Sequence, residues 1–351
     1  MSNFGIDAEL IDFEILSAWM DNTGLPRGEF TSVETLAGGT QNVLLKFARG
    51  GHAYVLRRGP RFLRPKSNEV MRREQRMLRA LSGTDVRHPR FIAGCEDESV
   101  MGGAVFYLME PVDGFNPSVA LPALHASDAA VRRQMGFEIA DGIAALGRVD
   151  YIAVGLDGFG QPGGFLERQV PRWLSELESY NRFEGYPGPE IPGIDRVAAW
   201  LEQNRPSAWT PGIMHGDYHF ANVLYSYNGP ELAAIVDWEM CTIGDPLLDL
   251  GWLLATWPDA GNPSASVGAG IAAAGGLPTM DEIVARYATG STRDLSAIGW
   301  YAVLACFKLG IVLEGTHARA CAGKAPRAVG DMLHATTLGL FSRAASLIEK
   351  S

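Results

Sequence analysis

The segment from His215 to Asn222 reads His-Gly-Asp-Tyr-His-Phe-Ala-Asn, and an Asp-Trp-Glu triplet follows at 237–239. It brings two carboxylates and a carboxamide, from Asp217, Asn222 and Asp237, next to two short apolar runs. Oxygen ligands of this kind suit Mg²⁺, which keeps several waters and takes one or two protein carboxylates beside substrate phosphates. The order Asp-x-x-x-x-Asn, then a further Asp, is typical of kinase-type phosphoryl transfer. In that chemistry the first aspartate accepts the hydroxyl proton, while the asparagine and the second aspartate hold magnesium.

Two other interpretations compete with this one. A single aspartate or asparagine most often lies in a turn and caps backbone groups, although the whole set at this spacing favours phosphoryl transfer. Alternatively, His215, Asp217 and His219 are transition-metal ligands, because histidines at i and i+4 can share a helix face. Gly216 disfavours a helix here, and neither a cysteine nor a third histidine lies nearby in the sequence, which makes this interpretation the weaker one.

The overall composition limits the classes of partner. The chain has 351 residues, 30 Lys and Arg against 40 Asp and Glu, and 47% hydrophobic residues. This acidic balance argues against a nucleic-acid-binding or anionic-membrane-binding protein, because both need clustered basic residues. No apolar run reaches about 18 residues, since the best one, 301–313, is broken by Lys308. We therefore expect neither nucleic acid nor a membrane as a partner.

The cysteines and the first residues indicate a compartment. Cys95, Cys241, Cys306 and Cys321 are widely spaced and form no Cys-x-x-Cys pair. This spacing predicts free thiols in a reducing compartment, neither a disulfide framework nor a zinc site. The first residues lack the basic segment with which a signal peptide begins. We therefore expect a cytoplasmic protein.

The first third of the chain has the pattern of a small β-rich lobe. Apolar spacing over 7–21 predicts an amphipathic helix. The short, β-branched and apolar segments 30–36, 42–48 and 52–58 are separated by glycine pairs, which predicts an antiparallel meander of three strands. Further elements are expected as a charged helix at 66–81 and two strands on either side of Gly102-Gly103, the second at 104–110.

The rest of the chain is mainly helical by the same criteria, so the predicted fold class is α+β. A proline- and glycine-rich linker lies at 111–122. Beyond it, two apolar runs at 222–225 and 232–236 flank Asn228-Gly229 and predict a hairpin. The expected parts are an N-terminal helical extension over 1–29, a small lobe over 30–112 and a large lobe over 113–351. Helices are expected at 127–147, 165–181, 194–204, 246–257, 280–289, 294–318 and 327–349.

Three motifs together resemble those of one family. They are His-Gly-Asp-x-x-x-x-Asn at 215–222, Ile-Val-Asp-Trp-Glu at 235–239 and Gly-Asp-Pro-x-x-Asp-Leu at 244–250. This pattern resembles the aminoglycoside phosphotransferase family, which is related to choline kinases and protein kinases, and the resemblance extends over about 30–345. It implies a protein-kinase-like fold of two lobes, a small antiparallel N-lobe and a larger, mainly helical C-lobe, with ATP and Mg²⁺ as cofactors.

The resemblance also implies a role for each motif residue. Asp217 would be the catalytic base, and Asn222 and Asp237 would be the magnesium ligands. His215 and Asp249 would support the catalytic loop. The acceptor of the phosphoryl group would be a hydroxyl of a small molecule.

A glycine-rich loop at 37–42 corresponds to the family's phosphate-binding loop. Glycine allows a close approach of the backbone to phosphates. A Gly-Gly pair between strands is also typical of a simple hairpin turn, and the segment is not a Gly-x-Gly-x-x-Gly fingerprint, which argues against a Rossmann fold. The residues expected to close over ATP are Gly38, Gly39, Thr40 and Asn42.

Four more residues are implied in nucleotide binding. Arg57 occupies the strand position at which kinases carry a phosphate-binding lysine, and arginine keeps the charge and can bind phosphate bidentately. Glu74 would be its partner on the following helix, although without the family it could be an exposed helix charge. Glu110 and Val112 would read adenine through a backbone carbonyl and N–H, around Pro111, or this strand simply ends at proline.

The choice of acceptor depends on a narrower resemblance. Arg-Arg-Gly-Pro at 57–60 and the segment 154–173 resemble the branch that includes the kinase-like domain fused to some acyl-CoA dehydrogenases. That resemblance implies a hydroxyacyl-CoA or hydroxy acid as acceptor, and next an aminoglycoside or macrolide antibiotic. Basic residues that could contact an anionic acceptor, or that could instead be solvated helix charges with packed stems, are Arg168, Arg172, Lys308 and Arg319.

Two alternatives to a small-molecule kinase remain. A nucleotide-binding pseudokinase or regulatory module would not need Asp217, Asn222 and Asp237 together, although Arg57 is compatible with it. An enzyme acting on protein is disfavoured by the long helical block at 125–205, which precedes the catalytic loop. The oligomeric state stays open.

Overall fold

The computed structural model describes residues 10–36, 42–258 and 269–350. They form two compact units, called the first and the second unit below. The first consists of residues up to Asp113 together with 154–156 and 233–241, and the second contains 114–153, 157–232 and 242 onwards. The boundaries expected from the sequence stay a prediction, and the segment 233–241, which carries Asp237, packs with the first unit.

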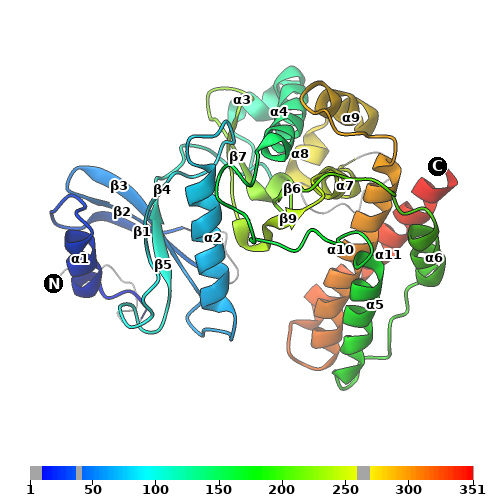
Figure 1. Cartoon of the computed structure of the whole chain (residues 1–351), viewed down its shortest axis with the longest axis horizontal. Coiled ribbons are helices and arrows are strands. Elements are labelled where there is room, and N and C mark those ends of the chain that lie inside the picture. Colours follow the sequence, from blue (N-terminus) through cyan, green and yellow to red (C-terminus); the bar gives the residue numbers. More distant parts are fainter. Residues whose placement is uncertain (1–9, 37–41, 259–268, 351) are drawn as a thin grey trace. The chain divides into compact units, whose positions relative to one another are not determined.

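The first unit is built on a five-stranded antiparallel sheet of order β1-β2-β3-β5-β4, with helix α2 (Ser67–Leu81) beside it (Figure 1). The predicted meander is confirmed, because β2 pairs with both β1 and β3. In the pairing of β3 with β5, Arg57 lies opposite Tyr107, so both side chains leave the same face of the sheet. The strands are β1 (Thr31–Thr35), β2 (Val43–Arg49), β3 (His52–Arg58), β4 (Phe91–Cys95) and β5 (Phe106–Met109).

Helix α1 (Phe13–Asn22) completes the core of the first unit. Its Leu16 and Met20 belong to one apolar cluster with sheet residues that include Phe47 and Phe106. The helix begins later than the expected residue 7, because the Asp12 carboxylate accepts hydrogen bonds from the N–H groups of Glu14 and Ile15 and so caps the first turn.

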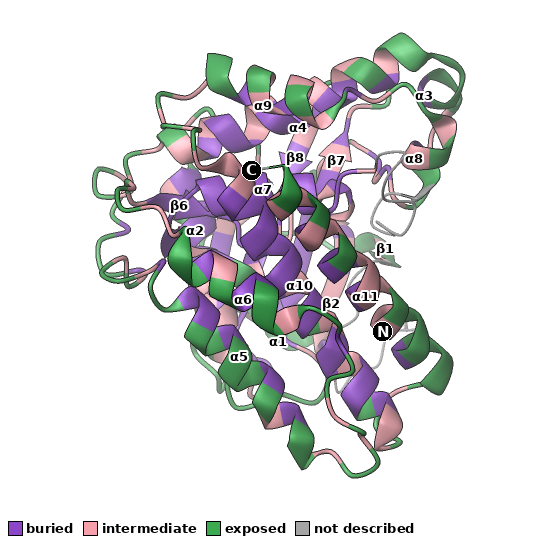
Figure 2. Ribbon diagram, turned by 90° about the vertical axis from the view of Figure 1, so that its right-hand side faces the viewer, coloured by how far each residue is buried: buried purple, intermediate pink, exposed green. Residues whose placement is uncertain are grey.

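The second unit is mainly helical and is organised around α10 (Ile298–Cys321), which packs against α11, α7, α5 and α6. By length and apolar composition α10 could cross a membrane, but 72% of its most apolar window is buried inside the protein. Figure 2 shows the same burial over α7 and α10. The other long helices are α4 (Ala129–Arg148), α5 (Gln169–Ser179), α6 (Ile194–Gln203), α7 (Leu247–Ala255), α9 (Met280–Thr289) and α11 (Arg327–Glu349).

Short strands and turns flank the segment from His215 to Asn222 and the residue Asp237. Strand β6 (Gly212–Met214) pairs with β9 (Thr242–Gly244), and His215 follows β6 directly. The predicted hairpin is present as β7 (Val223–Tyr225) and β8 (Leu232–Ile235). Short 3-10 turns precede β7 and follow Asp237, namely η2 (Phe220–Asn222) and η3 (Trp238–Met240).

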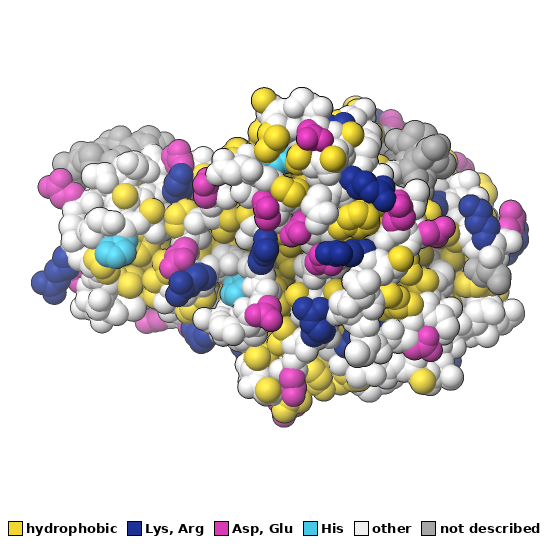
Figure 3. Space-filling model, turned by 90° about the horizontal axis from the view of Figure 1, so that it is seen from above, with side chains coloured by type: hydrophobic (Ala, Val, Ile, Leu, Met, Phe, Trp, Pro, Cys, Tyr) yellow, Lys and Arg dark blue, Asp and Glu magenta, His cyan; other side chains and the backbone are white. Residues whose placement is uncertain are grey.

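The helix expected at 127–147 is confirmed as α4 (Ala129–Arg148), and a separate short helix precedes it. Helix α3 (Ala123–Ser127) ends where Asp128 caps α4 by accepting from the N–H groups of Ala130 and Val131. The charged surface follows the composition, since basic and acidic side chains are interspersed on the face drawn in Figure 3.

Candidate active site

The loop after β6 is anchored by Asp249, in the first turn of α7. Its carboxylate accepts hydrogen bonds from the backbone N–H of His215 at 2.6 Å and of Gly216 at 2.8 Å. Burial raises the pKa of Asp249 to about 7, and the two backbone hydrogen bonds oppose that rise. Gly216 has a φ of 88°, a backbone angle that residues with a Cβ rarely adopt. The Asp249 carboxylate therefore fixes the backbone immediately before Asp217, and its supporting role in catalysis stays a prediction.

Asp217 is held by its neighbours in the same loop. Its Oδ1 lies 3.1 Å from Nε2 of His219, and the Asn222 amide donates to its Oδ2 at 2.9 Å and to its backbone oxygen at 2.8 Å. Burial raises the pKa of Asp217, but the hydrogen bond and charge of His219, with His215 and Lys308, outweigh it and hold the pKa below its usual range. The carboxylate is therefore ionised at neutral pH and can accept a hydrogen bond from a hydroxyl.

A buried cation lies behind this loop. Lys308, on α10, donates from Nζ to the Gly216 carbonyl at 3.3 Å. Its ammonium lies over the rings of Trp252 at 4.5 Å and Trp173 at 5.5 Å, both within the range of a cation–π contact. Burial lowers the pKa of Lys308 to about 8, against the charges of Asp249 and Asp217. Lys308, which was expected to contact the acceptor, therefore lies against the loop that carries Asp217.

In the first unit, Arg57 is fixed by two carboxylates. Its Nε lies 2.8 Å from Oε2 of Glu74, and its Nη2 donates to Oε1 of Glu74 at 3.0 Å and to Oδ1 of Asp237 at 2.8 Å. Tyr107 donates from its hydroxyl to Glu74 at 2.8 Å. Burial lowers the pKa of Arg57, but Glu74, Tyr107 and Asp237 outweigh it and raise the pKa overall. The structure therefore brings together the two residues expected to form an ion pair, and adds Asp237 to them.

The donor chemistry of Asn222 and Asp237 fits magnesium. The amide nitrogen of Asn222 faces Asp217, so its carbonyl oxygen is the atom offered to a cation. The carboxylate of Asp237 is 38% exposed and has one oxygen in contact with Arg57. Asp237 lies between β8 and η3 and has a φ of 64°. This backbone conformation is uncommon for a residue other than glycine, and the surrounding fold maintains it. Hard oxygen donors of this kind are those that Mg²⁺ takes beside phosphates.

The remaining nucleotide-binding residues are only partly described. Gly38, Gly39 and Thr40 lie outside the described residues. Asn42 donates to Oε2 of Glu239 at 3.5 Å. The N–H of Glu110 donates to Arg90, whereas within the described part of the chain nothing donates to its carbonyl or accepts from the Val112 N–H. These are the two backbone groups expected to read adenine.

The other basic residues expected at the acceptor have different surroundings. Arg172 is exposed and lies over the Trp173 ring at 5.2 Å, so it shares that ring with Lys308. Arg168 donates to the backbone oxygens of Gln161 and Gly163, which closes the loop before α5. Arg319 is exposed and donates to Thr316. Lys308 and Arg172 are therefore brought together, and Arg168 is occupied with the backbone of its own loop.

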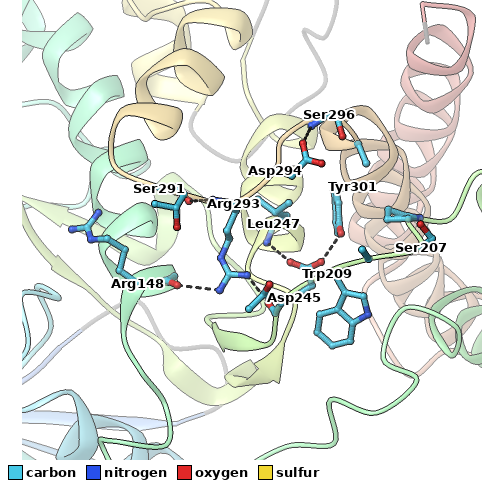
Figure 4. A pocket seen from close by; sticks show the side chains of 16 residues that line it. Arg148, Ser207, Trp209, Asp245, Leu247, Ser291, Arg293, Asp294, Ser296 and Tyr301 are labelled. Carbon is cyan, nitrogen blue, oxygen red and sulfur yellow. Dashed lines mark hydrogen bonds between the residues drawn. The ribbon is translucent and has the colours of Figure 1, made fainter.

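A cavity of about 680 Å³ lies elsewhere in the second unit (Figure 4). Arg293 donates there to the Gly147 carbonyl at 3.1 Å, and Asp245 accepts from the Tyr301 hydroxyl and the Leu247 N–H. None of the residues expected in the active site lines it. Its charged groups are paired with one another or with the backbone.

The structure also bears on the rival interpretation and on residues that the sequence did not indicate. Among the described residues, His215, Asp217 and His219 do not form a group whose ligand atoms converge on one centre. His219 instead pairs with Asp217 and accepts from the Ala221 N–H through Nδ1. Tyr107 beside Glu74 was not expected, and neither were Trp173 and Trp252 beside Lys308, because strand register and helix packing, which no local motif reports, create these contacts.

Comparison with known proteins places these features in a wider context. A model of the phosphotransferase enzyme family matches residues 32–283. The structure of a putative aminoglycoside phosphotransferase from Ralstonia eutropha JMP134 is 30% identical, with a TM-score of 0.76 over 95% of this chain and 98% of that one. Macrolide 2'-phosphotransferase MphH from Brachybacterium faecium is 17% identical and shares the fold, with a TM-score of 0.58 over 93% of this chain and 97% of that one.

Curated proteins give a further similarity. Acyl-CoA dehydrogenase family member 11 from Rattus norvegicus is 28% identical over 295 residues, which are 82% of this chain and 36% of that protein. The chain thus spans about a third of the length of this relative.

Proposed function

The chain belongs to the phosphotransferase enzyme family and is a small-molecule kinase, and from this premise we propose that it transfers the γ-phosphate of ATP, with magnesium, to a hydroxyl of a hydroxy acid or hydroxyacyl-CoA. The observation that carries the proposal is the environment of Asp217. An ionised carboxylate is held in place by Asn222 and His219, on a loop that Asp249 anchors. Asp217 therefore orients the attacking hydroxyl and takes its proton.

In phosphoryl transfer the protein forms no covalent bond of its own and acts mainly by positioning the reactants and stabilising charge. In a loose transition state the carboxylate of Asp217 acts mainly by positioning, which a carboxylate of low pKa does well, because the hydroxyl gives up its proton late. Asn222 keeps the carboxylate in one orientation through its amide. Magnesium, when bound through Asn222 and Asp237, would neutralise charge on the phosphates.

Arg57 supplies the fixed positive charge of the nucleotide site. Glu74 and Tyr107 hold the guanidinium in one orientation, and arginine stays protonated at any pH relevant to the enzyme. Because Nη2 of Arg57 donates to Asp237, a bound phosphate would compete with one carboxylate oxygen of Asp237 for this donor. We propose that Arg57 moves its Nη2 from Asp237 to a phosphate when ATP binds.

The class of acceptor rests on two supports. One is the similarity to the curated acyl-CoA dehydrogenase relative, of which the chain matches only a part. The other is that Lys308 and Arg172 both lie over the Trp173 ring, which provides positive charge beside the loop that carries Asp217. Both suit an acceptor with a carboxylate or phosphate. A polycationic aminoglycoside would instead need acidic residues in that place.

An acceptor panel tests this choice. ADP release would be measured with ATP and Mg²⁺ in the presence of hydroxy acids, hydroxyacyl-CoAs, aminoglycosides and macrolides at equal concentration. We expect kcat/KM to be at least tenfold higher for the anionic acceptors, and Arg172→Gln to raise KM for them. A higher kcat/KM for an antibiotic would contradict the proposed class of acceptor but not the kinase activity.

A nucleotide-binding module without turnover is the second candidate. The contact of Arg57 with Asp237 favours it, since a cation there competes with magnesium for the same carboxylate. It requires that nucleotide binds equally well without Mg²⁺ and that no acceptor in the panel consumes ATP. Magnesium-dependent consumption of ATP with any acceptor excludes this candidate.

A further inference from the structure

Helices α10 and α11 carry a cluster of polar side chains that the phosphoryl-transfer chemistry does not use. Glu314, His317 and Cys321 follow one another at i, i+3 and i+7, so they lie on one face of α10. His334 comes from α11, which packs along α10. The ligand atoms of Glu314, His317 and His334 all lie within 4.8 Å of one another. Two imidazoles and a carboxylate, with a thiol beside them, therefore converge on one point in the second unit.

We propose that Glu314, His317, Cys321 and His334 bind one zinc ion that joins α10 to α11. The donor set is two nitrogens, one oxygen and one sulfur, which suits Zn²⁺ in a closed tetrahedral site and does not suit Mg²⁺. Nε2 of His317 lies 3.6 Å from Sγ of Cys321. Two such ligands on a tetrahedral zinc lie about 3.6 Å apart, given typical bond lengths.

The carboxylate side of the site is close to the required geometry. Oε2 of Glu314 lies 2.7 Å from Nδ1 of His334. An oxygen and a nitrogen ligand of one zinc lie about 3.4 Å apart, so the two side chains must separate by a small rotation. Glu314 is fully buried, whereas the His334 side chain is 21% exposed, which leaves a path from solvent.

A second layer of side chains orients these ligands. Nδ1 of His317 is buried and has no hydrogen-bond partner among the described residues, yet it faces a carboxylate oxygen of Asp331 at 3.6 Å. With Nε2 on a metal, Nδ1 carries the proton and points to this carboxylate, as metal-bound histidines do. Tyr186 donates from its hydroxyl to the other oxygen of Glu314 at 2.8 Å. Arg327 binds Asp331 and also donates to Sγ of Cys321 at 3.5 Å.

Cysteine spacing alone predicts no zinc site here, because only one of the four ligands is a cysteine and His334 lies on another helix. The cluster also has a simpler interpretation, in which His334 and Glu314 form only a hydrogen bond and no metal is needed. The zinc site and the metal-free pair differ in whether the protein binds a transition metal at this cluster. The site is independent of the proposed phosphoryl transfer, so it can be tested on binding alone.

The experiment is a titration of the full chain, freed of metal by a chelator, with Co²⁺ and then Zn²⁺. We expect one equivalent of Co²⁺ to give the visible absorption of a tetrahedral site with a near-ultraviolet thiolate band, and Zn²⁺ to displace it. Cys321→Ser should lose the thiolate band and keep the visible bands. His317→Ala and His334→Ala should each weaken binding at least tenfold, whereas His52→Ala and Cys95→Ser should not change it.

A variant of the catalytic loop keeps the test specific, since His219 and Asp217 are the alternative place for a transition metal. We expect His219→Ala to bind Co²⁺ as the unchanged chain does. The wild type should also unfold at a higher temperature with Zn²⁺ than with chelator, and His317→Ala should lose that difference. The proposal is overturned if the unchanged chain gives no tetrahedral cobalt spectrum, or if binding is lost in His219→Ala and kept in His317→Ala.

Discussion

Lys308 is a charged residue that the fold buries behind its catalytic loop. Burial lowers its pKa from 10.5 to about 8, a shift that corresponds to about 3 kcal/mol. Between these two values the unfolded chain binds more protons than the folded one, so the free energy of unfolding rises with pH. Relative to low pH, this gain in the free energy of unfolding is complete above pH 10.5 and is lost as the pH falls through 8. At neutral pH the buried charge therefore lowers the free energy of unfolding.

The substitution Lys308→Met tests this account. Methionine fills a similar volume without the charge, so the melting temperature of the wild type minus that of the variant should increase from pH 8 towards 10.5. At pH 7 the variant should be at least as stable as the wild type, while kcat falls because the Gly216 carbonyl loses its donor. Melting curves that shift in parallel over this range would contradict the buried charge. Lys324→Met, at an exposed lysine, is the control.

Tyr107 is the residue through which the sheet orients Glu74. Replacing it by phenylalanine removes one hydrogen bond to a buried carboxylate and keeps the ring. We expect Tyr107→Phe to lower the free energy of unfolding by about 1–3 kcal/mol and to raise the KM for ATP, because Arg57 loses its fixed orientation. Tyr227→Phe, at a ring that is 48% exposed, should change neither quantity. An unchanged KM in Tyr107→Phe would mean that Arg57 does not depend on this network.

At the scale of elements, the packing of α7 on α10 sets the position of both Asp249 and Lys308. Gly251 lies where the two helices touch, and a Cβ there would come within 2.5 Å of the backbone carbon and oxygen of Tyr301. We expect Gly251→Ala to destabilise the chain by about 1–3 kcal/mol through overpacking. It should also reduce kcat, because Asp249 and Lys308 would separate.

The matched control is Gly163→Ala, since nothing lies within 4 Å of a Cβ built there. Its melting temperature should stay close to that of the wild type. Equal melting temperatures for the two alanine variants would show that the α7–α10 contact does not limit stability.

Most elements could be predicted from the sequence, because long helices carry a strong apolar period and strands are bounded by glycines. The helices at 280–289 and 327–349 agree with the prediction to the residue. Strands β6 and β9 were not predicted, since each has three residues and no local pattern distinguishes it from loop. The predicted start of α1 was wrong, because the Asp12 side-chain cap, and not apolar spacing, sets it. The short helix α3 before Asp128 was not predicted.

The candidate site was predictable only as far as local motifs extend. Asp217 and Asn222 lie five residues apart and are in contact. The contact of Arg57 with Glu74 was expected only from the resemblance to the family. The ring of Trp252 over Lys308 and the donation from Tyr107 to Glu74 depend on helix packing and strand register over longer distances. The cluster on α10 and α11 depends on the same packing.

At the scale of the molecule, the structure divides the expected machinery between two compact units. The first holds Arg57, Glu74 and Asp237, and the second holds Asp217, Asn222 and Lys308. The formal charge of −10 does not reveal the acceptor, because the groups that would meet phosphate and acceptor include buried or partnered cations.

The central claim is that Asp217 is the base of a phosphoryl transfer, and rapid-quench measurement of labelled phosphate moving from ATP to the best anionic acceptor tests it most directly. We expect Asp217→Asn to slow the transfer step by about 10²- to 10⁴-fold, while the Kd for ATP with Mg²⁺ changes less than about threefold, since asparagine keeps the size and most hydrogen bonds of the side chain. Transfer in Asp217→Asn at the rate of the wild type would contradict the account.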